Sequence, residues 1–416
     1  MNESNKRLHI CIMCSERIFE VTCGGTERFT ICLGKWLYEK GYDITLLGSG
    51  YFSRVKVKHL FRHHLERDEE IFQNTQRCET VQLPYHITLL SSLILIPWWI
   101  LKIFSIHRND PITLIHVQDT GYAALAAIIV GKFLKIPVML TSHGTRQEIF
   151  KFRLKGTINK LFLKLERCID MLTIKNATKV IVQNEAMKKR FEQLFSRTID
   201  ISPIPIKCKN FQFSESDRHS VREELGVDKK EIVIGYVGRF SSEKNIFSLV
   251  NAFISTINTH PLVKLVLIGS GQQECELKRI INKSNIQKRV LFLGVRHDIG
   301  RILSGFDIFV LPSYTEGMST ALLEAMACGR SIICSNIPAN RDLLVPNKEA
   351  IMFDPYRQDE LERAIHLLIR DSSLRMQLGE NSKVSVPKFD EEIIFSNLIS
   401  YYNSVISKNI SKSLRT

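Results

Sequence analysis

The sequence predicts an α/β protein made of two doubly wound domains in tandem, and three observations lead to that prediction. The chain has 416 residues, which is more than a single hydrophobic core usually holds. Its composition, 44% apolar and 24% charged residues, is ordinary for a globular protein. Short apolar runs alternate with amphipathic stretches in both halves of the chain. A segment rich in proline and polar residues, 202–216, separates the two series and is interpreted as a linker.

The first series predicts a parallel sheet with helices on both faces. Residues 7–15 form the first expected strand, and a glycine-rich turn after them opens a helix. A helix of small residues is expected at 121–134. Further strands are expected at 43–50, 113–117, 137–144 and 178–184. We expect this N-terminal, Rossmann-like domain to span residues 1–205.

The second series repeats the alternation, and we expect its Rossmann-like domain to span residues 206–388. An amphipathic helix at about 389–410, with no strand after it, is expected to return to the first domain and complete it. Two such domains imply a cleft between them. The expected strands of this half are 231–240, 264–271, 289–295, 307–313 and 331–335.

Residues 80–101 form an uncharged apolar stretch. We favour a buried helix of the first domain, and leave open an interfacial membrane contact through Trp98 and Trp99 or a membrane span. Pro84, Pro97 and several hydroxyl groups argue against the span.

The net charge of +14 predicts an anionic partner. Residues 1–203 hold 29 basic against 19 acidic side chains, and residues 132–190 alone hold 14 against 4. No module with basic residues and stacking aromatics is found, so we expect no nucleic-acid partner. We expect this segment to rest on the anionic inner face of the cell membrane, which makes the protein cytoplasmic and peripheral.

The ten cysteines and the lack of a cleavable signal favour reduced thiols in the cytosol. Cys11 and Cys14 form a C-x-x-C pair, but no second pair follows at zinc-site spacing. His116 lies within a predicted strand and is interpreted as a core residue. We therefore assign no metal or redox role to these residues.

The segment EGMSTALLEAMACGR, residues 316–330, carries two glutamates eight positions apart. Ser319 or Thr320 is a natural N-cap for the helix that follows, and Gly329 ends it. Glu316 in the turn and Glu324 one turn into the helix have carboxylates able to accept hydrogen bonds from vicinal hydroxyl groups. Helix-terminal amides and carboxylates together suit a polyhydroxyl or phosphate ligand.

A second motif, GYVGRFSSEKN at 235–245, places Arg239 at the end of a strand and Lys244 at the start of the next helix. A guanidinium fork and an ammonium beside a helix start suit a diphosphate. They can also neutralise the charge that builds on a leaving group. No Asp-x-Asp triplet occurs in the chain, so a metal-bridged diphosphate lacks its usual ligands.

In the first half, Gly24 and Gly25 bring bare backbone to the end of the first strand, and His143 ends another strand. The G-x-G-x-x-G spacing is absent, and the second strand ends without an acidic residue. Both features argue against a nicotinamide cofactor. A histidine at a carboxyl strand end is a candidate ligand contact.

Taken together, these motifs resemble the retaining glycosyltransferases of family 4, of GT-B architecture, along nearly the whole chain. The resemblance rests on GGTER (24–28), SHG (142–144), GRFSSEKN (238–245), IGSG (268–271) and, above all, EGMSTALLEAMACG (316–329). Two departures stand out. The turn after Glu316 is Gly-Met-Ser-Thr where many members have Gly-Phe-Gly, and residues 204–207 are Ile-Pro-Ile-Lys where Pro-Asn-Gly is common.

The resemblance implies a metal-free, retaining transfer from a nucleotide-sugar donor with no cofactor. Arg239 and Lys244 then bind the diphosphate, and Glu324 binds the ribose. The transferred sugar is bound by Glu316 and the amides of Gly317, Met318, Ser319 and Thr320. Gly269, Val295 and Arg296 lie near the base, Gly25 near the β-phosphate, and His143 near the reacting face of the sugar.

We expect a UDP-hexose or UDP-N-acetylhexosamine donor and a saccharide acceptor, lipid-linked, in surface polysaccharide synthesis. Two alternatives remain open: a catalytically inactive scaffold or partner-binding protein, and a nucleotide-sugar epimerase that releases nucleotide without an acceptor.

Overall fold

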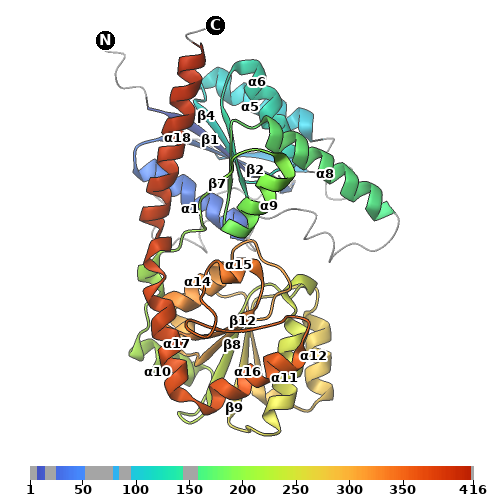
Figure 1. Ribbon diagram of the computed structural model, residues 1–416, viewed down its shortest axis with the longest axis vertical. Coiled ribbons are helices and arrows are strands. Elements are labelled where there is room, and N and C mark those ends of the chain that lie inside the picture. The colour runs from blue at the N-terminus through green and yellow to red at the C-terminus, as the bar shows by residue number, and fades with distance from the viewer. Residues whose placement is uncertain (1–6, 15–24, 52–77, 84–94, 144–157, 414–416) are drawn as a thin grey trace. The chain divides into compact units, whose positions relative to one another are not determined.

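The chain forms two compact units, each built around one parallel sheet (Figure 1). The computed structural model describes residues 7–14, 25–51, 78–83, 95–143 and 158–413. Unit 1 comprises Met1–Gln183, Met187–Pro203 and Phe395–Thr416. Unit 2 comprises Asn184–Ala186 and Ile204–Ile394.

The sheet of unit 1 has the strand order β3-β2-β1-β4-β5-β6-β7, and every pair in it is parallel. The order reverses between β1 and β4, as in a doubly wound fold. Strand β1 has all six residues buried, because helices cover both faces of the sheet. The strands are β1 (His9–Cys14), β2 (Asp43–Tyr51), β3 (Cys78–Leu83), β4 (Leu114–Val117), β5 (Val138–Ser142), β6 (Lys179–Val182) and β7 (Asp200–Ile201).

Helices cover the two faces of this sheet in separate sets (Figure 1). On one face α5 (Ile96–Asn109) packs against α6 (Tyr122–Leu134), and α6 packs against α8 (Ile158–Asn176). The same core includes Phe191 of α9 (Glu185–Phe195). On the other face α1 (Gly25–Glu39) meets α18 (Glu391–Ser413), where the rings of Trp36 and Phe395 lie 5.5 Å apart. The terminal helix therefore belongs to unit 1 from Phe395 onward.

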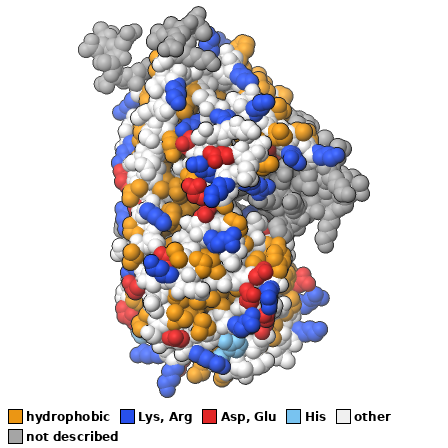
Figure 2. Space-filling view, in the orientation of Figure 1, with side chains coloured by type: hydrophobic (Ala, Val, Ile, Leu, Met, Phe, Trp, Pro, Cys, Tyr) orange, Lys and Arg blue, Asp and Glu red, His pale blue; other side chains and the backbone are white. Residues whose placement is uncertain are grey.

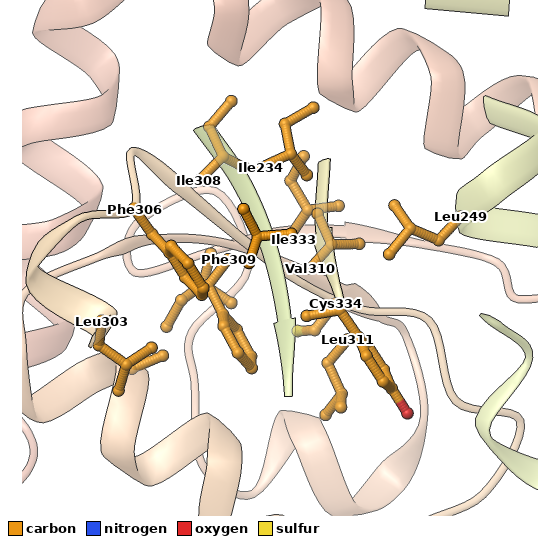
Figure 3. Close-up of a cluster of buried hydrophobic side chains, with 14 of the residues drawn as sticks. Ile234, Leu249, Leu303, Phe306, Ile308, Phe309, Val310, Leu311, Ile333 and Cys334 are labelled. Carbon is orange, nitrogen blue, oxygen red and sulfur yellow. The ribbon is translucent and has the colours of Figure 1, made fainter. Parts of the chain in front are cut away.

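Unit 2 repeats the topology with six strands in the order β10-β9-β8-β11-β12-β13, all parallel. Figure 3 shows Ile234, Val310 and Ile333 in the middle of its core, with Leu303 and Leu249 on opposite sides. The strands are β8 (Ile232–Val237), β9 (Val263–Ile268), β10 (Val290–Gly294), β11 (Ile308–Leu311), β12 (Ser331–Ser335) and β13 (Ile351–Phe353). The helices are α10 (Glu215–Glu224), α11 (Ile246–Ile257), α12 (Glu274–Lys283), α13 (Ile299–Ser304), α14 (Thr320–Ala327), α15 (Pro338–Arg341), α16 (Gln358–Arg370) and α17 (Ser372–Val384).

The two sheets confirm the predicted class, an α/β protein with two doubly wound domains. The interpretation of 80–101 as one helix is wrong: residues 78–83 form the edge strand β3, and α5 begins only at Ile96. Pro97 stands in the first turn of α5, where a missing N–H breaks no helical hydrogen bond. Among the described residues, no helix combines the length and apolar composition that crossing a bilayer requires.

The interpretation of residues 202–216 as a plain linker is also wrong. Ile204, Ile206 and Phe211 are buried in the core of unit 2, and Cys208–Phe211 forms a short 3₁₀ turn. Ser214 then caps α10 by accepting a hydrogen bond from the Asp217 N–H at 3.3 Å. The prolines separate short buried segments here rather than marking an exposed tether.

Candidate functional site

The candidate site lies in unit 2, at the carboxyl edge of the sheet where the strand order reverses. Strand β8 pairs with β9 on one side and with β11 on the other. Loops that leave strands at such a reversal diverge, and ligands of doubly wound proteins bind there. Arg239 and Lys244 follow β8, and Glu316 follows β11. Parallel pairing of β8 and β11 thus brings these three charged residues to one edge.

Lys244 and Glu316 form an ion pair at this edge. The Lys244 ammonium donates to both carboxylate oxygens of Glu316 at 2.8 Å, and the Ser313 hydroxyl donates to one of them at 2.7 Å. The side chains of Glu316 and Lys244 are only 6% and 18% exposed. A carboxylate this buried requires a counter-charge and hydrogen bonds. The sequence predicted a contact from each residue to a ligand, but did not predict their pairing or the part played by Ser313.

Arg239 carries the more accessible positive charge of the site. Its side chain is 58% exposed, and its guanidinium lies 3.7 Å from a carboxylate oxygen of the buried Glu243. The hydroxyl of the buried Tyr236 donates to the Arg239 carbonyl at 2.9 Å and holds the loop. Burial, then the negative charges of Glu316 and Glu243, raise the pKa of Tyr236 well above its usual range. Tyr236 therefore remains a neutral donor, and Arg239 presents its guanidinium to solvent.

Asn245 determines how Lys244 enters the site. Its backbone is left-handed, with φ of 51°, a conformation that asparagine tolerates better than most residues. The Asn245 amide donates to the Pro355 carbonyl at 3.2 Å, and its oxygen accepts from the Ser248 hydroxyl at 2.7 Å. The chain turns sharply between Lys244 and α11, which leaves the Lys244 side chain directed to Glu316.

The start of α14 provides the amides predicted from the sequence. Ser319 is the N-cap, with its hydroxyl accepting from the Leu322 N–H at 3.3 Å, and Thr320 is the first helical residue. Amides of a first turn have no partner within the helix, and the helix dipole is positive there. Met318 is buried, and its sulfur accepts from the Ile204 N–H at 3.1 Å. Glu324 lies in the second turn and is 3% exposed.

Gly269 lets the ends of β8, β9 and β10 meet through bare backbone. Its φ is 128°, and a Cβ added there would lie 2.0 Å from the Gly238 carbonyl oxygen. Its N–H donates to the Gly294 carbonyl at 2.7 Å. Glycine is therefore required at this position by both conformation and space.

Arg296 is engaged by acidic neighbours. Its guanidinium contacts Asp298 at 2.8 Å and Glu224 at 3.0 Å, and Arg301 contacts the same two carboxylates. Hydrogen bonding to Asp298, opposed by partial burial, raises the pKa of Arg296 further above its ordinary value. Val295 beside it is 48% exposed. The turn 295–296 thus offers an apolar side chain to a ligand, while the charge of Arg296 is balanced within the protein.

In unit 1, His143 follows β5 and has hydrogen-bond partners on both ring nitrogens. Nε2 lies 3.1 Å from the side-chain oxygen Oε1 of Gln118, and Nδ1 accepts from the side-chain amide of Gln183. Burial lowers the pKa of His143 to about 4, with the Asp119 charge opposing the shift. His143 is therefore neutral, with its proton on Nε2. Gly25 is the first residue of α1, whereas Gly24 lies outside the described residues.

His116 is a buried core residue, as predicted. Its ring nitrogens lie 2.6 Å from the Tyr402 hydroxyl of α18 and 2.7 Å from the Thr141 hydroxyl. Burial, with a smaller contribution from the charge of His143, lowers its pKa to about 3. The sequence did not reveal these partners, or those of His143. Thr141 lies on β5 and Tyr402 on α18, and the two glutamines directly follow β4 and β6.

The pKa of His116 predicts a loss of stability in mild acid. Below the unfolded pKa of 6.5 the unfolded chain binds a proton that folded His116 does not, so stability falls as pH drops from 6.5 toward 3. At pH 5 we expect a loss of about 2 kcal/mol from this residue. Urea unfolding at pH 7 and at pH 5 measures this loss in the free energy of unfolding. Between these two pH values the His116→Gln variant should lose about 2 kcal/mol less than the wild-type protein. An identical pH dependence in both proteins would contradict the assignment.

The part of the chain that the structure describes contains no group of three or more His, Cys, Asp or Glu side chains placed to hold a metal ion. Of the predicted residues, Arg239, Lys244, Glu316 and the start of α14 share the sheet edge of unit 2. Arg296 instead belongs to its own ion-pair cluster, and His143 belongs to unit 1.

Family models match most of the chain in two consecutive parts. Residues 23–205 match the model described as Glycosyltransferase Family 4, and residues 217–385 match the model described as Glycosyl transferases group 1. The chain is 23% identical over 406 residues to N-acetyl-alpha-D-glucosaminyl L-malate synthase of Bacillus anthracis, covering 96% of this chain and 98% of that protein.

Other relatives and solved structures agree with these matches. The chain is 27% identical over 278 residues to the UDP-Gal:alpha-D-GlcNAc-diphosphoundecaprenol alpha-1,3-galactosyltransferase of Escherichia coli, covering 65% of this chain and 69% of that one. Sucrose-phosphate synthase of Thermosynechococcus elongatus superposes with a TM-score of 0.79 at 19% identity, covering 97% and 100%. Anabaena HepE, solved in complex with UDP-glucose, superposes with a TM-score of 0.75 at 20% identity, covering 96% and 100%.

Proposed function

Because the chain belongs to the group 1 glycosyltransferases of family 4 type, we propose that it moves a hexose or N-acetylhexosamine from a UDP-sugar to a lipid-linked saccharide, in surface polysaccharide synthesis. The transfer retains the anomeric configuration and uses no metal. The observation that carries the proposal is the Lys244–Glu316 pair beside Arg239, at the reversal point of the unit 2 sheet.

In this proposal the diphosphate of the donor meets Arg239 and Lys244. Lys244 is held by Glu316 before the donor arrives. The Lys244 ammonium has three N–H donors, which an approaching phosphate shares with Glu316. A carboxylate oxygen of Glu316 then becomes available to accept a hydrogen bond from a sugar hydroxyl group. The first-turn amides of α14 add a positive dipole on the same side. Glu324, in the second turn of α14, accepts from the ribose hydroxyl groups.

The chemical step follows from the same charges. The bond between the anomeric carbon and the phosphate oxygen breaks, and both electrons leave with the phosphate. Arg239 and Lys244 neutralise the charge that develops there, which takes the place of a metal ion. The acceptor hydroxyl attacks from the face that the phosphate leaves, and its proton passes to the departing phosphate oxygen. Attack on that face retains the configuration.

In this proposal His143 lies near the reacting face of the sugar and does not transfer a proton. Its pKa of about 4 keeps the imidazole neutral, and each ring nitrogen already has a glutamine partner. Gly25, at the start of α1, contributes backbone N–H to the donor phosphate.

The names of several relatives favour this donor and this acceptor. The Escherichia coli relative uses UDP-Gal and acts on a diphosphoundecaprenol-linked sugar. A relative in Campylobacter jejuni, 24% identical over 372 residues, is also named for a diphospho-undecaprenol acceptor. HepE was solved with UDP-glucose. A uridine diphosphate donor and a polyprenyl-linked acceptor are thus the pair we assign.

A donor panel tests the proposal. The protein is incubated with UDP- and GDP-sugars and a bacterial lipid extract, with and without EDTA, and nucleotide release and lipid product are measured. We expect acceptor-dependent UDP release that EDTA does not change, and NMR of the product to show the donor's anomeric configuration. Nucleotide release without acceptor would identify the epimerase alternative, and loss of turnover with EDTA would refute the metal-free step.

A further inference from the structure

The outer surface of α5, α6 and α8 in unit 1 combines exposed apolar side chains with basic ones. We call it the α5–α6–α8 face. Trp98 and Leu101 of α5 are 60% and 63% exposed, and Phe133 of α6 is 76% exposed. Leu172 of α8 is 52% exposed. Such side chains on neighbouring helices indicate a surface that is covered in use.

The charges of this face have one sign. Lys132, Lys164, Arg167 and Lys175 are exposed. The sequences of the three helices contain only two acidic residues, both on α8, and both point inward.

These two acids are Glu166 and Asp170, and they are 0% and 4% exposed. Glu166 accepts from the Tyr122 hydroxyl at 2.7 Å, and Asp170 accepts from the Thr120 hydroxyl at 2.6 Å. The outer positions of α5, α6 and α8 are therefore free of negative charge.

Helix α12 of unit 2 shows the ordinary pattern for comparison. There Lys278 pairs with Glu274, and Arg279 pairs with Glu276. Mixed signs of this kind are typical of a surface that remains in water. The one-sided charge of the α5–α6–α8 face is thus a local property of unit 1.

The three helices present this face as one surface. The rings of Phe104 on α5 and Phe133 on α6 lie 5.6 Å apart. The Lys132 ammonium on α6 donates to the Asn176 side chain on α8 at 2.6 Å. Figure 2 shows orange and blue side chains next to one another along α8.

We propose that the α5–α6–α8 face binds the surface of a lipid bilayer that contains anionic phospholipids. The proposal rests on the proposed function in one respect, since a lipid-linked acceptor lies in such a bilayer. Trp and Leu side chains enter the headgroup region, and Lys and Arg attract anionic headgroups. Acids on the outer side would be repelled by such lipids, and none are present there on these helices.

Vesicle sedimentation with the full chain tests the face. Sucrose-loaded vesicles of phosphatidylcholine are compared with vesicles that also contain phosphatidylglycerol, at low and high salt. We expect binding to the anionic vesicles that added salt weakens. Lys164→Gln, Arg167→Gln and Lys175→Gln together should weaken partitioning about 100-fold, since each basic residue contributes about five-fold. Trp98→Gln with Leu101→Gln should weaken it by about 10-fold.

The matched control exchanges exposed residues of the same kinds in unit 2. Lys283→Gln with Met376→Gln should leave partitioning unchanged, because Lys283 and the 68% exposed Met376 lie outside the face. UDP release from the donor in detergent solution should be the same in all variants. Wild-type protein that releases UDP but ignores anionic vesicles would overturn the membrane proposal alone. Vesicle binding without sugar turnover would overturn the proposed function alone.

Two further outcomes would assign the face to another partner. Light scattering that shows a dimer which Trp98→Gln with Leu101→Gln dissociates would make the face a self-association surface. Equally tight binding of single-stranded RNA, weakened by the α8 substitutions, would make it a nucleic-acid surface. Either result would overturn the lipid assignment.

Discussion

Replacing Lys244 by alanine is expected to lower kcat for sugar transfer by about 100- to 1,000-fold, the usual effect of losing one group that stabilises developing charge. Lys244 supplies a positive charge whose value increases as the phosphate leaves, so the loss falls on kcat more than on donor affinity. Initial rates with saturating donor and acceptor measure kcat, and calorimetric titration with UDP measures affinity.

Two controls accompany this variant. Lys278→Ala removes an exposed ammonium that also pairs with a glutamate, and it should leave kcat unchanged. Since Lys244→Ala leaves the Glu316 carboxylate buried with Ser313, urea unfolding must show that unit 2 still folds. A folded Lys244→Ala protein with near wild-type kcat would remove Lys244 from the proposed chemistry.

Replacing Gly269 by alanine is expected to destabilise unit 2 by about 3–5 kcal/mol, within the range of large single-residue effects. The added Cβ would lie 2.0 Å from the Gly238 carbonyl oxygen, and the φ of 128° is strained for any side chain. The added Cβ is fixed to the backbone at the end of one strand, and the oxygen belongs to the backbone at the end of the adjacent strand. Relieving the clash therefore requires a displacement of the backbone. Urea unfolding, followed by circular dichroism rather than tryptophan fluorescence, measures the loss in the free energy of unfolding.

Gly226→Ala is the matched control, because Gly226 also has a positive φ, 58°, but nothing lies within 4 Å of an added Cβ. This substitution should cost about 1–2 kcal/mol, the cost of the left-handed backbone alone. Equal losses for the two variants would mean that crowding at Gly269 is unimportant, and the close approach of β8 and β9 at the site would need another explanation.

Much of the fold is encoded locally, and the sequence predicts it for that reason. Central strands such as His9–Cys14 are apolar runs because both of their faces are buried. The edge strand Cys78–Leu83 escaped prediction, since an edge strand has one strand neighbour and its sequence CETVQL contains polar residues. Its last four residues open the uncharged stretch 80–101, which suggested one long helix instead.

The residues of the site could be predicted from the sequence, but the contacts between them could not. Arg239, Lys244, Glu316 and Ser319 were identified from motifs in which each residue lies next to a strand or helix end, and that adjacency is local. The contact of Lys244 with Glu316 joins residues 72 positions apart, and it exists because β8 pairs directly with β11. Sequence spacing does not report which strands are neighbours.

The sequence by itself therefore determined the two doubly wound domains and the charged groups of the site, because hydrophobic alternation and end motifs are written in consecutive residues. Only the tertiary structure decided that Glu316 holds Lys244, that two glutamines occupy His143, and that the acids of α8 face inward. These depend on strand order and on helix rotation against the sheet. Both are set by long-range packing, which no local stretch of sequence records.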